Sequence, residues 1–489
     1  MIDTEALRKK IIDLAIQGKL TQQLPEDGNA EDLYVQIQEE KTKLIKDGKI
    51  KKEKPLPEIT DDEIPFEIPN NWKWVYLGDV FNHNTGKALN ASDKTGSKME
   101  YITTSNLYWD HFELDNLKSM YFTESELEKC TIQKGDLLIC EGGDIGRSAI
   151  WPYDREMRIQ NHIHKLRSYC EIEQKFYYYV LRDYKYSGLI DGRGIGLQGF
   201  SSQRVHSLVV PLPPLDEQRR IVRIIDSAYI HIDVINTLQQ QYEFDREILK
   251  RKIIDAGIRG KLTEQLPEDG DAEDLYAQIQ EEKAKLIKDG KLKKEKPLPE
   301  ITDDEIPFDI PEDWKWVRLG NLGANVPNAF ADGPFGSNLK REHYTSEKQV
   351  RIIQLSNVGI EGWKDDNEKY TTYEHLKTIQ RSEVKAGDIV IAKMMPAGRS
   401  IVVPDISNAY VLSSDCVKFV PNSLLDTNYL RYAINSNIFH DQVLQDVHGI
   451  GRERTSLSNL KRYLLPIPPI EEQKRIVSII EAMFIQLAK

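Results

Sequence analysis

The chain has 489 residues, of which 40% are hydrophobic and 29% charged, as is typical of a soluble globular protein with more than one domain. No apolar run approaches the length of a membrane span, and the first residues, MIDTEALRKK, lack the apolar segment of a signal peptide. The four cysteines have no CxxC spacing, which argues against structural zinc and a disulfide framework, so we expect a cytoplasmic protein.

The net charge of −12 is unevenly distributed along the chain. Residues 1–71 carry −5 and residues 208–313 carry −9, whereas residues 72–207 carry −1 and residues 314–462 carry +3. An acidic chain disfavours nucleic acid as a partner. The two near-neutral segments, however, have room for locally basic loops, so the charge is compatible with DNA binding without demonstrating it.

Two passages of the chain occur twice. Residues 7–78 recur as residues 249–320 with 58 of 72 positions identical, and residues 208–226 recur as residues 463–481. The segments between them are largely unlike. A period near 250 residues is too long for a solenoid repeat, so the chain is a duplicated domain in which common and variable segments alternate.

The common segments have helical patterns. An amphipathic helix is expected at 30–47 and again at 272–289, each followed by a Lys- and Pro-rich extended connector. A long helix is expected at 216–259, because apolar residues recur at heptad spacing. Gln239 and Arg246 interrupt this seam; they either set its register or mark a water-lined break.

The ends of the chain fit the same repeat. By the repeat offsets, the N-terminal helix matches the second half of the long helix, and the C-terminal helix matches its first half. Together they predict a split second copy that packs antiparallel to the continuous helix, with the two termini close together. The predicted architecture is therefore circularly pseudo-symmetric.

The variable segments have strand patterns: short alternating runs of Val, Ile, Leu and Tyr bounded by Gly, Asp and Pro. Helices are expected within them at 174–186 and 426–445. Faint similarities between the two segments, such as Gly-Arg-Ser at 146–148 and 398–400, indicate one fold with two different surfaces. The fold class is thus α+β, with two β-rich domains separated by long antiparallel, coiled-coil-like helical regions.

Enzyme motifs are weak or missing. The GxGxxG at 194–199 loses its third glycine in the repeat, and a PD-(D/E)xK-like fragment at 311–315 loses its acids. There is no GxxxxGK[ST] phosphate loop and no [DNS]PP[YF] methyltransferase box. His162 and His164 have no matching Cys or carboxylate cluster and are more typical of a strand than of a metal site.

The repeated motifs resemble those of one family. They are PxPP[LI]xEQ[RK]RI at 211–221 and 466–476, I[RQ]GKLT at 258–263 and 16–21, and WxWVxLG at 72–78 and 314–320. In combination, and over essentially the whole chain, they resemble the DNA-specificity subunit of type I restriction–modification systems. The resemblance implies five segments: a helical region 1–71, target-recognition domain 72–207, central helical region 208–313, second target-recognition domain 314–462, and C-terminal helix 463–489.

The same resemblance implies the function. Two recognition domains would read a bipartite, asymmetric site in double-stranded DNA, and the helical regions would dock two methyltransferase subunits, with restriction–translocase subunits joining the complex. The chain itself would be non-catalytic and without cofactor, since S-adenosylmethionine belongs to the partner methyltransferase. The alternatives are a self-contained nuclease or methyltransferase with degenerate motifs, and a protein scaffold that does not bind DNA.

Candidate DNA contacts are polar residues in glycine-containing loops, because Arg, Lys, Asn and Gln bond base edges and Ser and Thr bond phosphates. In the first domain they are Ser105, Asn106, Tyr108, Arg147, Ser148, Gln160, Asn161, Arg193, Gln198, Ser201, Ser202, Gln203 and Arg204. In the second they are Lys340, Arg341, Ser356, Asn357, Lys393, Arg399, Ser400, Ser413, Ser414, Arg452, Arg454 and Thr455. The recurring Gly-Arg-Ser suits either a phosphate grip or a shared turn.

Overall fold

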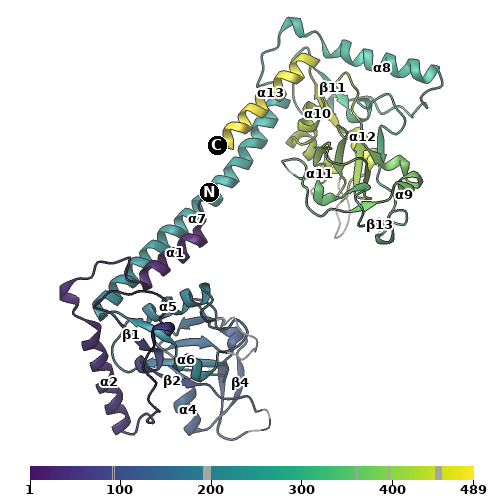
Figure 1. Ribbon diagram of the computed structural model, residues 1–489. Helices are drawn as coiled ribbons and strands as arrows, with labels where there is room; N and C mark the ends of the chain where they lie inside the picture. Colours follow the sequence, from purple (N-terminus) through teal and green to yellow (C-terminus); the bar gives the residue numbers. More distant parts are fainter. Residues whose placement is uncertain are drawn as a thin grey trace. The chain divides into compact units, whose positions relative to one another are not determined.

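The computed structural model describes residues 1–90, 92, 94–190, 200–359, 361–394, 397–446 and 454–488 (Figure 1). It divides into two compact units, residues 1–240 and 241–489. Each unit contains a β-rich domain and a share of one long helix, α7 (Leu215–Ile258). Among the described residues, no helix is long and apolar enough to cross a membrane.

A terminal helix packs antiparallel to α7 in each unit. In unit 1, α1 (Thr4–Ile16) starts where Gln239 bonds the backbone of Ile2, and the chain that follows it reaches Glu217. In unit 2, α13 (Ile470–Leu487) begins beside the end of α7 and finishes where the Tyr242 hydroxyl bonds the Leu487 carbonyl. The predicted pairing of the long helix with two terminal helices is confirmed.

The residues that interrupt the heptad seam have identifiable contacts. The Gln239 amide donates to the Ile2 carbonyl at 3.2 Å and accepts from the Ile2 backbone nitrogen at 2.6 Å. Arg246 pairs with Glu243 one turn earlier at 2.7 Å. Gln239 therefore positions the start of the chain on α7, which favours the register interpretation for that residue.

The amphipathic helices of the common segments lie where the sequence predicts them. They are α2 (Ala30–Lys46) and α8 (Ala272–Lys288), capped by Asn29 and Asp271. Each buries the same small apolar face, including Ile37 in one copy and Ile279 in the other. The connector that follows each helix is irregular apart from one 3-10 turn, at Asp61–Glu63 in unit 1 and at Asp303–Glu305 in unit 2.

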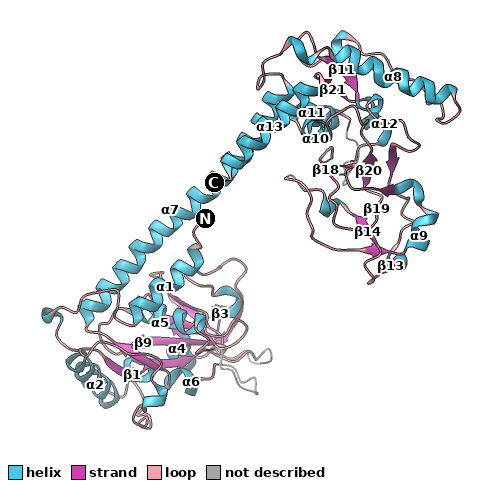
Figure 2. Ribbon diagram, turned by 45° about the horizontal axis from the view of Figure 1, so that its top comes forward, coloured by secondary structure: helices cyan, strands magenta, loops and turns pink. Residues whose placement is uncertain are grey.

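Both β-rich domains have the same strand order. In unit 1 the sheets run β2-β9-β6-β7 and β4-β3-β8-β5, and in unit 2 they run β12-β20-β17-β18 and β13-β15-β14-β19-β16. A two-stranded antiparallel pair closes each domain, β1 with β10 and β11 with β21. The second domain thus repeats the first with one added edge strand, β13 (labelled in Figure 2), which confirms the predicted common fold.

The strands are short, as expected for small twisted sheets. Those of unit 1 are β1 (Lys73–Tyr76), β2 (Phe81–Thr85), β3 (Ser97–Ile102), β4 (Lys118–Phe122), β5 (Thr131–Ile132), β6 (Leu137–Cys140), β7 (Ser148–Ile150), β8 (Met157–Ile159), β9 (Ile163–Ser168) and β10 (Val209–Leu212). Those of unit 2 are β11 (Lys315–Arg318), β12 (Phe330–Asp332), β13 (Tyr344–Thr345), β14 (Val350–Ile353), β15 (Tyr370–Thr371), β16 (Glu383–Val384), β17 (Ile389–Ala392), β18 (Ser400–Val402), β19 (Tyr410–Leu412), β20 (Cys416–Phe419) and β21 (Leu464–Ile467).

One helix of each domain joins its sheet to the terminal helix. In unit 1 this is α5 (Gln174–Tyr186), as predicted, which contacts both α1 and β7. In unit 2 it is α10 (Thr427–Ile434), which contacts α13 and β18. The prediction of one helix over 426–445 is wrong, because α10 ends at Ile434 with Asn435 as its C-cap, and Ser436 caps a second helix, α11 (Asn437–Gln445).

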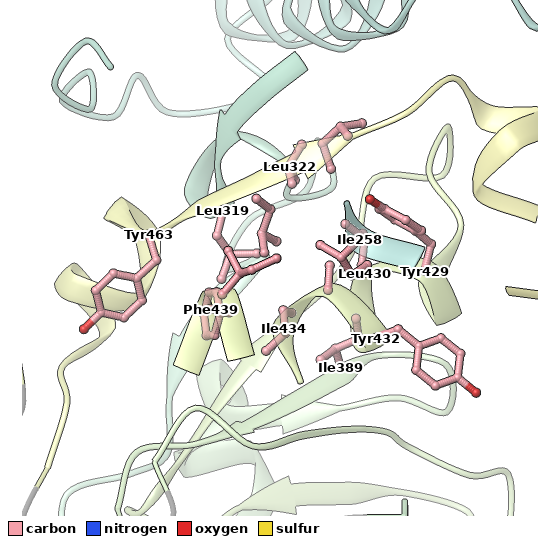
Figure 3. Packing of buried hydrophobic residues seen from close by; sticks show 14 of the residues in the cluster. Ile258, Leu319, Leu322, Ile389, Tyr429, Leu430, Tyr432, Ile434, Phe439 and Tyr463 are labelled. Atoms are coloured by element: carbon pink, nitrogen blue, oxygen red, sulfur yellow. The ribbon is translucent and has the colours of Figure 1, made fainter. Parts of the chain in front are cut away.

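The remaining helices are short. They are α3 (Leu77–Val80), α4 (Glu124–Cys130) and α6 (Ser202–His206) in unit 1, and α9 (Tyr373–Thr378) and α12 (Leu457–Arg462) in unit 2. The largest core of unit 2 lies where α7, α10, α11 and the sheet meet, and it contains Ile258, Ile389, Leu430 and Phe439 (Figure 3). The helical region and the β-rich domain of this unit therefore share one continuous core.

A buried carboxylate joins three segments at the same place in each unit. Glu217, on the first turn of α7, accepts hydrogen bonds from Trp72 Nε1 at 2.8 Å, Thr21 Oγ1 at 2.9 Å and Gln23 Nε2 at 2.9 Å. Its side chain is fully buried. In unit 2, Glu472 on α13 accepts the equivalent bonds from Trp314, Thr263 and Gln265.

An ion pair lies beside each carboxylate. Arg220 bonds both oxygens of Asp27 at 2.7 and 2.6 Å, and Arg475 bonds Asp269 in the same way. The arginine in each pair lowers the pKa of its aspartate through these hydrogen bonds. The repeat therefore gives each unit the same joint, by which we mean the buried carboxylate (Glu217 or Glu472) with its donors and the neighbouring ion pair.

The Glu217→Ala change is expected to loosen unit 1 alone. The buried Trp72 indole N–H left without an acceptor costs roughly 1–3 kcal/mol, so we expect the local opening free energy to fall by about 1–3 kcal/mol. Hydrogen exchange followed by mass spectrometry should show faster exchange at residues 15–25 and 70–76, and unchanged exchange at residues 257–267. Asp216→Ala, at the exposed neighbouring carboxylate, is the matched control; equal exchange in both variants would contradict the assignment.

Candidate nucleic-acid interface

Two parallel strands bring two loops to one edge of each domain. In unit 1, Ile102 of β3 lies opposite Ile159 of β8 in parallel register. Parallel strands end on the same side, so the turn that holds Ser105 and the loop that holds Gln160 and Asn161 lie next to each other. The backbone nitrogen of Gln160 donates to the Ile102 carbonyl at 3.0 Å, which fixes the two loops together.

The same geometry in unit 2 forms a small polar hollow. Strands β14 and β19 are parallel, and the loops that follow them meet where Ser413 donates its backbone N–H to Ile353 at 2.8 Å. The resulting hollow has a volume of about 280 Å³. Its polar lining is Gln354, Ser356, Ser413, Ser414 and Asp415. Three of the predicted residues of the second domain, Ser356, Ser413 and Ser414, are therefore brought together.

Basic residues border this hollow. Arg454 pairs with Asp415 at 2.5 Å and leaves half of its side chain exposed. Lys393 pairs with Asp332 at 2.6 Å, and its carbonyl accepts the backbone N–H of Thr455 at 2.9 Å. Serines, a glutamine and two cations at one edge have the chemistry that base edges and phosphates require.

Glycines allow the loops to approach each other. A Cβ atom at Gly86 would lie 2.1 Å from the Ile159 carbonyl oxygen, and one at Gly333 would lie 1.7 Å from the Ser413 carbonyl oxygen. The neighbouring atoms are backbone, which cannot be displaced without moving the loop. Each edge therefore depends on a glycine at an equivalent position after β2 or β12.

A neutral histidine pair supports the edge of unit 1. His83 and His164 are bonded through ring nitrogens at 2.9 Å, and His164 Nε2 donates to the Phe200 carbonyl at 2.7 Å. Burial lowers the pKa of His83 to about 3 and also lowers that of His164, so both rings are neutral at pH 7. The pair anchors the chain just before Ser201, whereas His162 lies exposed beside Glu141.

Several predicted residues hold loops instead of facing solvent. Asn106 and Asn357 occupy equivalent turns, where their side-chain oxygens accept from the backbone nitrogens of Thr103 and Gln354 at 2.9 Å. The side chains of Ser148, Asn357, Ser400 and Thr455 are buried. Their polar groups are engaged within the domains, so their structural role is to shape the edge.

The recurring Gly-Arg-Ser is a shared turn. Gly146 and Gly398 have φ of +82° and +86°, a conformation that favours glycine. Arg147 donates to the Thr104 carbonyl at 2.6 Å and lies 5.0 Å from the ring centre of Tyr108. The turn is common to both domains, whereas the surroundings of the two arginines differ.

The remaining predicted residues lie in short turns or helices or outside the described residues. Ser201 caps α6, where its side chain accepts from the backbone nitrogen of Arg204. Lys340 and Arg341 begin a short 3-10 turn between Leu339 and Tyr344, and these two flanking residues line the polar hollow of unit 2. Arg193, Gln198 and Arg452 lie outside the described residues, so their predicted roles stay predictions.

Unit 1 has a polar hollow of its own, which the sequence did not predict. It has a volume of about 820 Å³ and lies between the Lys-rich connector and strands β2 and β9. Ser202 and Gln203 line it together with Lys49, Lys51 and Asn82. The sequence signal for this hollow is the run of four consecutive polar residues in β2, FNHNT, which the predictions did not use.

The comparison with known families identifies the class of protein. A family model described as the type I restriction modification DNA specificity domain matches residues 69–243 and 311–489. These two matches cover both β-rich domains and most of the chain. The chain belongs to the type I restriction–modification DNA-specificity family.

Individual relatives agree with this assignment over nearly the full length. The chain is 29% identical to the type I restriction enzyme EcoAI specificity subunit of Escherichia coli, covering 96% of this chain and 87% of the relative. It is 26% identical to the EcoEI specificity subunit of Escherichia coli, covering 98% and 88%.

Solved structures share the fold. A chain from a study of complex assembly and conformational transition in the type I R-M system aligns with a TM-score of 0.56 at 18% identity, covering 87% of this chain and 93% of that one. The HsdS subunit of Thermoanaerobacter tengcongensis aligns with a TM-score of 0.50 at 18% identity, covering 87% and 92%. These likenesses support the α+β fold with two β-rich domains.

Proposed function

We propose that this chain reads a bipartite, asymmetric site in double-stranded DNA, one half with each β-rich domain. The observation that carries the proposal is that both domains have the same strand order and bring equivalent loops to one edge, but with different residues there. Gln160 and Asn161 stand in unit 1 where Ser413 and Ser414 stand in unit 2, whereas Ser105 and Ser356 are the same residue type at equivalent positions. Different donors and acceptors at equivalent positions select different bases.

The helical regions are proposed to dock two methyltransferase subunits. In unit 1, Ile230, Val234 and Leu238 follow each other at four-residue spacing on α7 and are more than half exposed. In unit 2, the exposed apolar residues Tyr242, Phe244 and Leu249 lie on the same helix. An exposed apolar stripe on a helix is typical of a protein-binding face.

The proposed division of labour assigns methyl transfer to the partner. The methyltransferase subunits would hold S-adenosylmethionine, and restriction–translocase subunits would join the assembled complex. This chain would contribute base recognition and the helical region that connects the two recognition domains. The family assignment and the degenerate enzyme motifs support this division.

The Gly333→Ala change tests whether each domain reads one half-site. The added Cβ would displace the loop that carries Ser413 and Ser414, so we expect binding of the full site to weaken at least tenfold, with discrimination lost at only one half. The measurement is a mobility shift of the complex with its methyltransferase, on duplexes in which each half-site is substituted in turn.

Gly336→Ala is the matched control for this test, because a Cβ at Gly336 meets nothing within 4 Å and its backbone is not in the left-handed region. It should leave binding unchanged. Gly86→Ala should affect the opposite half-site. If Gly333→Ala weakens discrimination at both halves equally, the two-reader proposal is wrong.

The Leu238→Asp change tests the docking face. A charge in the middle of the apolar stripe should reduce co-purification of the methyltransferase at least tenfold, because burying an unpaired carboxylate is unfavourable. Thr237→Asp, on the neighbouring exposed position of α7, is the control for a change of charge alone. Undiminished co-purification with Leu238→Asp would place the partner elsewhere.

A further inference from the structure

A cavity in unit 2 lies between α7, α10 and the Gly-Arg-Ser turn. It has a volume of about 200 Å³. Its apolar walls include Ile254, Ile434 and Phe484, and its cationic lining consists of Lys250, Arg251, Arg399 and Arg431. We refer to it as the Arg399 cavity. It is formed entirely by residues of unit 2 and is separate from the polar hollow at the edge of the domain.

The acidic residues of the cavity are already occupied. Glu247 and Glu361 both pair with Lys250, the former at 3.2 Å. Among the described residues no acid pairs with Arg251, Arg399 or Arg431, and the cavity lining holds four cations against two carboxylates. A cavity with this balance favours an anion.

Two of these guanidinium groups are partly buried without full bonding. The Nε atoms of Arg399 and Arg431 are buried and have no hydrogen-bond partner among the described residues. Burial also lowers the pKa of Arg399. Arg431 lies 4.1 Å from the ring centre of Tyr432, which holds its guanidinium at the cavity wall. Burying a charged donor without an acceptor is unfavourable, so an anion that bonds these groups would stabilise the site.

The equivalent place in unit 1 is filled by side chains. The backbone nitrogen of Glu173 bonds the Gln218 side chain in unit 1, and that of Asp426 bonds the Gln473 side chain in unit 2. These equivalent bonds align α5 with α10, so Tyr178 of unit 1 stands at the position equivalent to Arg431 of unit 2. By the same alignment, Arg182 of unit 1 stands at the position equivalent to Asn435 of unit 2. Its guanidinium pairs with Asp110 at 2.8 Å and lies within about 6 Å of the ring centres of Trp109, Tyr178, Tyr186 and Tyr229.

The two domains thus differ at equivalent positions of α5 and α10. In unit 1 one arginine has a carboxylate and four aromatic rings around it. In unit 2, Arg431 stands in place of the aromatic Tyr178, and Asn435 stands in place of Arg182. The cavity between these helices is therefore not filled by side chains. The asymmetry gives unit 2 a site that the other copy of the fold lacks.

We propose that the Arg399 cavity binds a small phosphate monoester whose organic group is apolar. The phosphate oxygens accept hydrogen bonds from Arg399, Arg431 and Arg251, because guanidinium groups match phosphate geometry. The organic group packs against Ile254, Ile434 and Phe484. This site acts independently of the proposed DNA reading.

Calorimetric titration of the full chain with phenyl phosphate tests the proposal. We expect saturable binding with a submillimolar Kd, and at least tenfold weaker binding of inorganic phosphate and of phenol, each of which supplies half of the contacts. Arg399→Gln and Arg431→Tyr should each weaken binding of phenyl phosphate at least tenfold. Arg431→Tyr introduces the residue that the same fold already holds at Tyr178 in unit 1.

Lys377→Gln is the control, since this exposed cation on α9 lies outside the cavity. It should leave the Kd unchanged, and each variant should keep the circular dichroism spectrum of the parent chain. The proposal is overturned if the parent chain does not bind phenyl phosphate, or if both cavity variants bind it as tightly as the parent. Competitive displacement of phenyl phosphate by duplex DNA would also overturn it, because the arginines would then belong to the DNA surface.

Discussion

The buried carboxylate at the start of a helix is the contact on which the rest of each unit depends. Glu217 and Glu472 each accept from a tryptophan indole, a threonine hydroxyl and a glutamine amide. These donors come from the entrance of the β-rich domain and from the chain that leaves the neighbouring helix. A single charge therefore sets the position of the domain relative to its helical pair. Since the tryptophan indole is buried, replacing the carboxylate leaves its N–H without an acceptor, and the joint tolerates little variation.

Around this joint the two domains are free to diverge. Their sheets share one strand order, and the loops after the parallel strands meet at the same edge in both. The frame of each domain needs only backbone hydrogen bonds, a glycine after β2 or β12, and an asparagine in the turn after β3 or β14. The exposed positions beside these have no such structural duty. The frame of each domain is thus separate from its exposed surface positions.

Much of this organisation could be predicted from the sequence. The near-identical repeat located α2, α8 and α7, because strong periodicity and caps are local signals. The break between α10 and α11 was missed because Ser436 reads as an ordinary helical residue unless its capping bond is seen. The candidate contacts were harder still. Ser148, Asn357 and Ser400 have the chemistry of DNA contacts, but the fold buries them.

The surroundings of Arg399 could not be predicted from the sequence either. Arg399 was singled out by its Gly-Arg-Ser motif, but only packing shows that its environment differs from that of Arg147. Whether an arginine meets a carboxylate, a ring or an open cavity depends on residues far away in the chain, such as Asp110 and Tyr229 in unit 1. No local pattern reports such contacts.

Methylation mapping of a genome that carries this chain with its co-encoded methyltransferase tests the central claim most directly. Two different readers on one chain predict an interrupted, asymmetric methylated motif that disappears when this chain is deleted. A continuous palindromic motif, or methylation that persists after the deletion, would contradict the account.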